Sequence, residues 1–178
     1  MNREDIIFRE VKDDDFEQIV VLYHEYLDWQ RTQEGRQEKY LTADEMRDVF
    51  HKRKKGSQAE NYDLSKAPFL SNHYGWVAEE KGRIIAYYEW GGNLDIDNTC
   101  KAYISVYENR KELESIAEEL LVYTFGELKK IGFKIALGHI SPRMAKHPQF
   151  QFLEKYADRK IEEIKGKPEL GIQFQKDL

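Results

Sequence analysis

The chain has 178 residues, of which 40% are hydrophobic and 13% aromatic, and its formal net charge is −5. This composition excludes global disorder and predicts a single domain, residues 1–178, that buries about two thirds of its unfolded surface. The acidic balance argues against nucleic acid as a partner, because phosphate binding needs a basic face.

The sequence also predicts a cytoplasmic protein with no membrane partner. Its single cysteine, Cys100, has no internal disulfide partner, and the alternation around it predicts a buried small side chain rather than a nucleophile. The first residues include no apolar leader, and no apolar run approaches about 18 residues. The basic run from His51 to Lys55 is typical of the last turn of a helix, with an RNA-associated role as a remote alternative.

The first third of the chain predicts one strand and two helices. Ile6 to Val11 is typical of a strand, and Asp13-Asp14-Asp15 predicts the N-cap of a helix that frays from Gln30 onward. Thr42 and Glu45 have the spacing of a capping box for a second helix, which Gly56 ends. Residues 57–72 show no clear period, which leaves a lid and a plain surface insertion as alternatives.

The centre of the chain predicts a meander of three antiparallel strands, at Tyr74–Glu79, Arg83–Trp90 and Thr99–Tyr107. In the third strand, alternation predicts one common face for Cys100, Ala102, Ile104 and Val106. A long amphipathic helix follows, ends at Gly132, and leads into a strand from Phe133 to Leu137, which together predict a βαβ unit.

The last part of the chain predicts a helix and a closing pair of strands. The helix starts near Ser141 and is firm from Gln149, and the strands are Ile161–Ile164 and Gly171–Phe174. The predicted fold class is therefore mixed α/β (α+β): a central mixed sheet in which an antiparallel meander precedes a βαβ unit, with helices on both faces.

Three segments carry a resemblance to a known family. Residues 152–161, Phe-Leu-Glu-Lys-Tyr-Ala-Asp-Arg-Lys-Ile, are similar to an F-Y-E-K-x-G-F-x-K stretch, and Phe174–Leu178 is similar to an x-K-x-L ending. Ala102 to Arg110, followed by Leu120-Leu121, resembles a V-x-P-x-x-R … L-L region. These segments and the order of the elements resemble the GNAT superfamily of N-acyltransferases.

The resemblance implies that acetyl-CoA or another acyl-CoA is the co-substrate and an amine the acceptor. It implies that the central strand, at Ser105, Val106 and Tyr107, binds the thioester through its backbone. It also implies that the pyrophosphate lies at the start of the long helix, beside Arg110 and Lys111.

The sequence departs from the family at this corner. Residues 111–115 are Lys-Glu-Leu-Glu-Ser, without the family's glycines, and Asn109 with Glu112 has the spacing of a capping pair. Glu112 and Glu114 place negative charge where the pyrophosphate is expected.

The acid and base of the reaction are also predicted from this resemblance. Leu153 replaces the tyrosine that protonates the thiolate in many members, and Tyr156, about one turn later, is the substitute candidate. The proton acceptor is predicted to be Glu89, on one face with Tyr87 and Ile85; the alternative is that Glu89 lies on a solvated strand edge. Tyr103, Tyr107 and His139 are further candidates, and the sequence has no metal-ligand spacing.

Two functions remain open from the sequence. The first is an N-acetyltransferase that transfers an acyl group to a small-molecule or peptide amine. The second is a catalytically degenerate GNAT-like domain that acts as a binding or regulatory module.

Overall fold

A mixed β-sheet lies at the centre of the computed structural model, which describes residues 5–34, 39–56, 72–108, 111–140, 154–161 and 172–178. The described strands have the order β1-β2-β3-β4-β5-β7-β6, and β4 with β5 is the parallel pair among antiparallel neighbours. Their bounds are β1 Ile6–Glu10, β2 Asn72–Glu80, β3 Arg83–Gly92, β4 Thr99–Tyr107, β5 Ile135–Ile140, β6 Arg159–Ile161 and β7 Ile172–Asp177.

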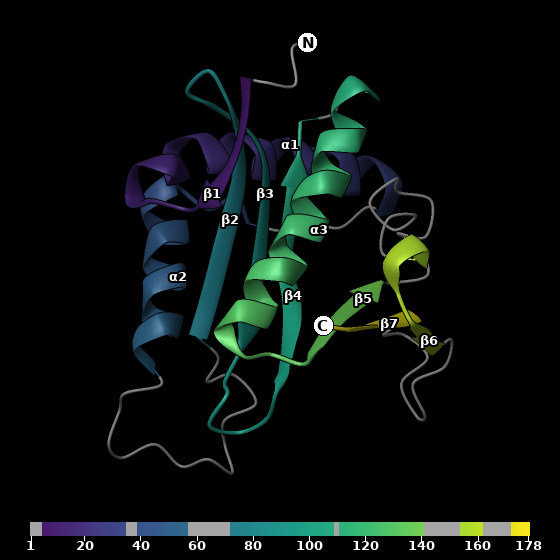
Figure 1. Ribbon diagram of the computed structural model, residues 1–178. Helices are drawn as coiled ribbons and strands as arrows, with labels where there is room; N and C mark the ends of the chain where they lie inside the picture. The colour runs from purple at the N-terminus through teal and green to yellow at the C-terminus, as the bar shows by residue number, and fades with distance from the viewer. Residues whose placement is uncertain (1–4, 35–38, 57–71, 109–110, 141–153, 162–171) are drawn as a thin grey trace.

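Helices cover both faces of this sheet (Figure 1), as the sequence predicts. The helices α1 (Phe16–Glu34) and α2 (Ala43–Gly56) pack on one face, and α3 (Glu114–Ile131) packs on the other. Two short 3-10 turns, η2 (Asp13–Asp15) and η4 (Lys111–Leu113), precede α1 and α3. The described helices include none that is both long enough and apolar enough to cross a membrane.

Several predicted boundaries are confirmed. The amide of Thr42 donates to Glu45 and the amide of Glu45 donates back to the hydroxyl of Thr42, which is the predicted capping box. Gly132 ends α3 in a left-handed conformation with φ of 118°, which glycine adopts without a Cβ penalty.

Other boundaries differ, for local reasons. α1 continues to Glu34, and within it the amide nitrogen of the buried Gln30 side chain donates to the hydroxyl of Tyr26 one turn earlier. β5 begins at Ile135 rather than Phe133, because the amide of Phe133 still donates to the carbonyl of Leu128 at the end of α3.

Near the C-terminus, β6 begins two residues before the predicted Ile161, and β7 extends to Asp177 beyond the predicted Phe174. The described residues include helical positions at Glu154–Tyr156 within the predicted last helix. The predicted loop at 57–72, apart from Asn72, and the predicted helix start near Ser141 lie outside the described residues.

Two β-bulges change which residues share a face. The β2–β3 hairpin turns at Lys81 (φ 52°) and Gly82 (φ 82°), a pair of positive φ values typical of a type I′ turn. Ala78 pairs with Ala86 but Glu79 pairs with Ile84, so Ile85 is an extra residue in β3. Ile85 therefore packs toward α3 while Tyr87 packs toward α1 and α2, and the predicted common face is wrong for Ile85.

The second bulge lies in β4. Glu89 pairs with Ile104 but Trp90 pairs with Ala102, so Tyr103 is the extra residue. Before the bulge, Cys100 and Ala102 pack on the α3 side; after it, Ile104 and Val106 pack on the α1–α2 side. The single apolar face predicted for these four residues is therefore wrong.

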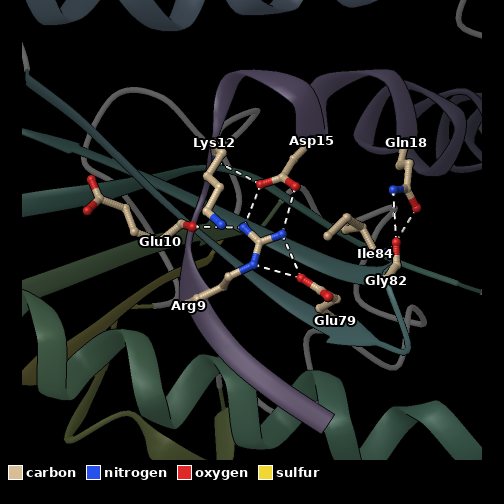
Figure 2. Close-up of polar contacts among 8 residues, drawn as sticks. All are labelled: Arg9, Glu10, Lys12, Asp15, Gln18, Glu79, Gly82 and Ile84. Carbon is tan, nitrogen blue, oxygen red and sulfur yellow. Dashed lines mark hydrogen bonds and ion pairs between the residues drawn. The ribbon is translucent and has the colours of Figure 1, made fainter. Parts of the chain in front are cut away.

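A partly buried guanidinium joins β1, β2 and the start of α1 (Figure 2). Arg9 donates two hydrogen bonds of 2.7 Å to the carboxylate of Asp15 and one of 2.7 Å to Glu79. The carboxylate of Asp15 also accepts a hydrogen bond of 2.7 Å from the amide of Lys12. Asp15 therefore caps the helix start from the third position of η2, whereas Lys12 takes the N-cap position predicted for the aspartate run. This arrangement fixes the entry of α1 onto the sheet.

Candidate functional site

The candidate site begins where β4 and β5 part. These parallel strands pair only over Thr99–Lys101 and Ile135–Leu137, although β4 continues to Tyr107. The bulge at Tyr103 lies just past the last paired residue, and β5 leans away from β4 in Figure 1. A bulge bends its strand, and this one lies two residues beyond the last β4–β5 pair, so the bend coincides with the opening of the sheet.

The backbone residues predicted to bind a thioester lie on this diverging part of β4. Ser105 is half-buried opposite Tyr88, and Val106 is buried against the α1–α2 core. Tyr107 packs toward α3, and burial, helped by the nearby Glu114 carboxylate, raises the pKa of its phenol to about 12. The structure thus places all three beside the divergence.

The start of α3 lies directly after this strand. The turn η4 directly precedes α3. The N-cap of α3 is Leu113, an apolar residue that supplies no capping oxygen to the amides of the first turn. Lys111 is exposed in η4, and Glu114 is a half-buried acid in the first turn of α3. Arg110 and the predicted cap Asn109 lie outside the described residues.

A buried network of titratable side chains lies on the α1–α2 face, next to the bulge. Glu89 is 3% exposed; one carboxylate oxygen bonds Nδ1 of His73, and the other accepts the hydroxyl of Tyr87 at 3.0 Å. The His73 side chain is fully buried, and its ring lies 4.5 Å from the half-exposed ring of Tyr103. Glu89 therefore does not lie on a solvated strand edge, and that alternative is wrong.

His73 is the one member of this network that the sequence does not single out. The register pairs Glu89 with Gly75, which places His73 two residues along β2 on the same face, at the diagonal position. Gly75 itself leaves room for the network, since a Cβ there would lie 2.9 Å from a ring carbon of Tyr87. The register of the β2–β3 hairpin would have identified His73 as the neighbour of Glu89, but only once the bulge at Ile85 was known.

Tyr156 has a different environment from the one its predicted role suggests. Its hydroxyl donates to Glu118 on α3 at 2.5 Å, and Lys155 pairs with the same carboxylate. The hydrogen bond to Glu118 raises the pKa of Tyr156, and the hydrogen bonds from Lys155 and Tyr156 lower the pKa of Glu118. Tyr156 thus ties the last helical turn to α3 and keeps its proton, and its role as an acid stays a prediction.

The remaining candidates contribute less to the site. Burial raises the pKa of the Cys100 thiol to about 12, as expected of a small core side chain. His139 pairs with Gln173 through the backbone of β5, and its side chain lies outside the described residues. Within the described ranges, no group of three or more His, Cys, Asp or Glu side chains could hold a metal ion.

A small hollow lies on the α3 side, near the point where β5 leaves β4. Gly138, the first residue of β5 beyond the paired segment, lines it with Ala136 and the α3 residue Phe125. β7 closes it through Phe174. This lining is mostly apolar, with Gln175 and Lys176 of β7 as its polar members.

Comparisons with known proteins agree on the fold. No protein-family model and no curated protein matches the sequence. Among solved structures, the chain is similar to PaiA N-acetyltransferase from Thermoplasma acidophilum in complex with coenzyme A, with a TM-score of 0.68, 14% identity and 100% coverage of both chains. It is also similar to an N-acetyltransferase from Staphylococcus aureus, with a TM-score of 0.64, 17% identity, and coverage of 97% of this chain and 98% of that one. A third structure, YncA from Salmonella typhimurium with acetyl-CoA, has a TM-score of 0.65 at 14% identity, with coverage of 98% and 94%. The chain therefore has the fold of the GNAT superfamily.

Proposed function

We propose that this protein is an N-acyltransferase that transfers the acyl group of acetyl-CoA, or of another acyl-CoA, to an amine of a small molecule or peptide. The observation that carries the proposal is the parting of β4 and β5 just before the N-terminus of α3. In this fold, structures similar to the chain hold coenzyme A or acetyl-CoA.

The chemistry of the corner supports this assignment. Amides of the first helical turn and the positive end of the helix dipole attract an anion such as a diphosphate. The N-cap Leu113 does not occupy those amides with a side-chain oxygen, and Lys111 adds an exposed positive charge one turn earlier. The β4 residues Ser105 to Tyr107 lie on the diverging strand, where the backbone would position the thioester for attack by the amine.

Binding of acetyl-CoA tests the proposal directly. At a hundredfold excess of ligand over its dissociation constant, a single site should stabilise the fold by about 2.7 kcal/mol. We expect a rise in the melting temperature with acetyl-CoA, a smaller rise with dephospho-CoA or ADP, and turnover of acetyl-CoA with members of a panel of primary amines. A protein that binds acetyl-CoA without turnover would be a degenerate binding module, and one that binds neither acetyl-CoA nor a longer acyl-CoA would not be an acyl-CoA-dependent transferase.

The carboxylates at the corner give a second expectation. Glu114 lies in the first turn of α3, and Glu112 precedes it in η4. Each is expected to repel a diphosphate by about 1 kcal/mol at short range in water. The double variant Glu112→Gly/Glu114→Gly should therefore bind coenzyme A more tightly, by about fivefold per carboxylate, in isothermal titration calorimetry.

The single variant Glu114→Gln separates charge from backbone flexibility, because it removes the charge without adding a glycine. The exposed Glu119, more than a turn further along α3, provides the matched control as Glu119→Gln, which should leave the affinity unchanged. Weaker or unaltered coenzyme A binding in the glycine variant would show that these carboxylates do not oppose the diphosphate.

A further inference from the structure

The surroundings of Glu89 make it a poor direct partner for an amine. Its two carboxylate oxygens are already bonded, one to His73 and the other to Tyr87, and its side chain is buried. A carboxylate in this position can hold and orient a neighbouring group. Lone pairs remain on both oxygens, but Glu89 is 3% exposed, so a substrate amine would have to enter the core to reach them.

His73 lies in a row of paired residues that crosses the sheet and ends at the last pair between β4 and β5. Its partner on β3 is Gly91, the partner of Gly91 on β4 is Lys101, and Lys101 pairs with Leu137 as the last β4–β5 pair. Neighbouring strands lie about 4.8 Å apart, so the Cα atoms of His73 and Lys101 are about 10 Å apart. Glycine at position 91 leaves no side chain on the strand between the His73 and Tyr103 rings, which approach to 4.5 Å.

The bond to Glu89 determines which nitrogen of His73 can accept a proton. When Nδ1–H donates to a carboxylate, the proton-accepting lone pair of a neutral imidazole is on Nε2. The other side chains that face this ring among the described residues are Phe50 from α2 and Tyr103 from β4. Of these two described side chains Tyr103 is the exposed one, with 36% of its surface accessible, whereas Phe50 is buried.

We propose that His73, oriented by Glu89, accepts the proton of the acceptor amine once the ring of Tyr103 turns aside; this rests on the acyl-transfer function proposed above. The amine lone pair forms a C–N bond to the thioester carbonyl carbon, and the C–S bond breaks with its electron pair on sulfur. The nitrogen loses a proton to Nε2 of His73, the departing thiolate takes a proton from solvent, and His73 returns its proton to solvent, so that the products are an amide and a thiol. Glu89 and Tyr87 are then positioning residues, which act through His73.

A purely structural role accounts less well for this network. Burying a histidine and a carboxylate together carries a desolvation penalty that apolar residues of similar volume would avoid. The pair lies under α2, where Phe50 contacts the ring of His73, and close to the point where the strands part, where the ring of Tyr103 packs on it at a bulge. A few converging polar side chains next to such an opening are typical of binding and catalytic sites.

The test uses His73→Asn, assayed with acetyl-CoA and the amine that the wild-type protein acylates fastest in a primary-amine panel. The asparagine amide can still donate to Glu89 from near the position of Nδ1, but it offers no imidazole nitrogen as a base. We expect kcat to fall by about 100-fold or more, while the KM for acetyl-CoA and the melting temperature change little. His51→Asn is the matched control, because His51 also pairs with a carboxylate, Asp13, but on the surface of α2, and its kcat should equal that of the wild type.

Two further measurements cover a variant that fails to fold. In His73→Gly, added imidazole should restore kcat by about tenfold or more if the ring is the base. In the wild-type protein, nitrogen NMR of labelled histidine near neutral pH should show the Nδ1–H tautomer for His73. A His73→Asn variant with wild-type kcat, no imidazole rescue, or an Nε2–H or doubly protonated ring would overturn the role of His73. Wild-type protein that neither binds nor turns over acetyl-CoA or a longer acyl-CoA would instead overturn the acyl-transfer function itself.

Discussion

Replacing Glu89 with glutamine is expected to lower kcat by about 100-fold or more and to leave the KM for acetyl-CoA nearly unchanged. The carboxylate accepts one bond from His73 and one from Tyr87, and an amide can accept at only one of its two terminal atoms. The glutamine NH2 group would either face the Tyr87 hydroxyl or force the other tautomer of His73. Either change acts on the proton transfer, and neither acts on the coenzyme.

Steady-state kinetics with acetyl-CoA, together with a thermal melt, measure this effect. Glutamine keeps the volume and some of the hydrogen bonding of Glu89, so the variant should stay folded. Glu127→Gln is the control, because Glu127 pairs with Lys130 on the outer face of α3, away from the network. Unchanged kinetics for Glu89→Gln would remove both Glu89 and the histidine it orients from the reaction.

Most of the fold could be predicted because its signals are local. Alternation and helical periodicity predict the meander, α3 and the parallel strand, and the capping box at Thr42 and the left-handed Gly132 act within a few residues. The resemblance to GNAT proteins depends on the same order of elements, and the similar solved structures support the fold across nearly the whole chain.

The site was harder to predict, because it depends on two single-residue insertions in the sheet. Without the bulge at Ile85, the hairpin would pair His73 with Trp90 and Glu89 with Tyr74. His73 and Glu89 would then point to opposite faces, since a slip of one residue reverses every side chain. Glu89 could be singled out from composition alone, as the acid in an apolar strand. Identifying its partner His73 required the true register of the hairpin.

The bulge at Tyr103 had the same effect on β4. Strict alternation places Ile104 and Val106 with Cys100, whereas the extra residue moves them to the opposite core, just beyond the last pair with β5. Bulges follow from how two whole sheet faces pack, and no short sequence pattern specifies them here. The position of β7 between β5 and β6 is likewise a long-range property of the chain.

Replacing Asp15 with asparagine is expected to lower the free energy of unfolding by about 3 kcal/mol near neutral pH, because it leaves part of the partly buried Arg9 guanidinium without its charged partner. Arg9 keeps its hydrogen bond to Glu79, so the loss of unfolding free energy should stay below that expected for a buried charge with no partner. Denaturant melts of the variant measure the change. Asp14→Asn is the control, because Asp14 is the exposed neighbour in the same aspartate run and should cost less than about 0.5 kcal/mol.

The same pair predicts how stability depends on pH. Burial opposes ionisation of Asp15, but the hydrogen bonds from Arg9 and from the Lys12 amide outweigh it and hold the pKa of the carboxyl below its ordinary value. The stabilisation is therefore fully present above the unfolded pKa of about 3.9 and is lost as the pH falls through the lower folded value. The gap between wild type and Asp15→Asn should accordingly close in acid, and a gap that persisted there would mean that shape rather than charge holds this contact.

Phe16, the next residue, packs against the ring of Tyr87, so a loosened entry of α1 should also reach the carboxylate of Glu89 through Tyr87. We therefore expect Asp15→Asn to lower kcat modestly, by about twofold to fivefold, by weakening the positioning of His73.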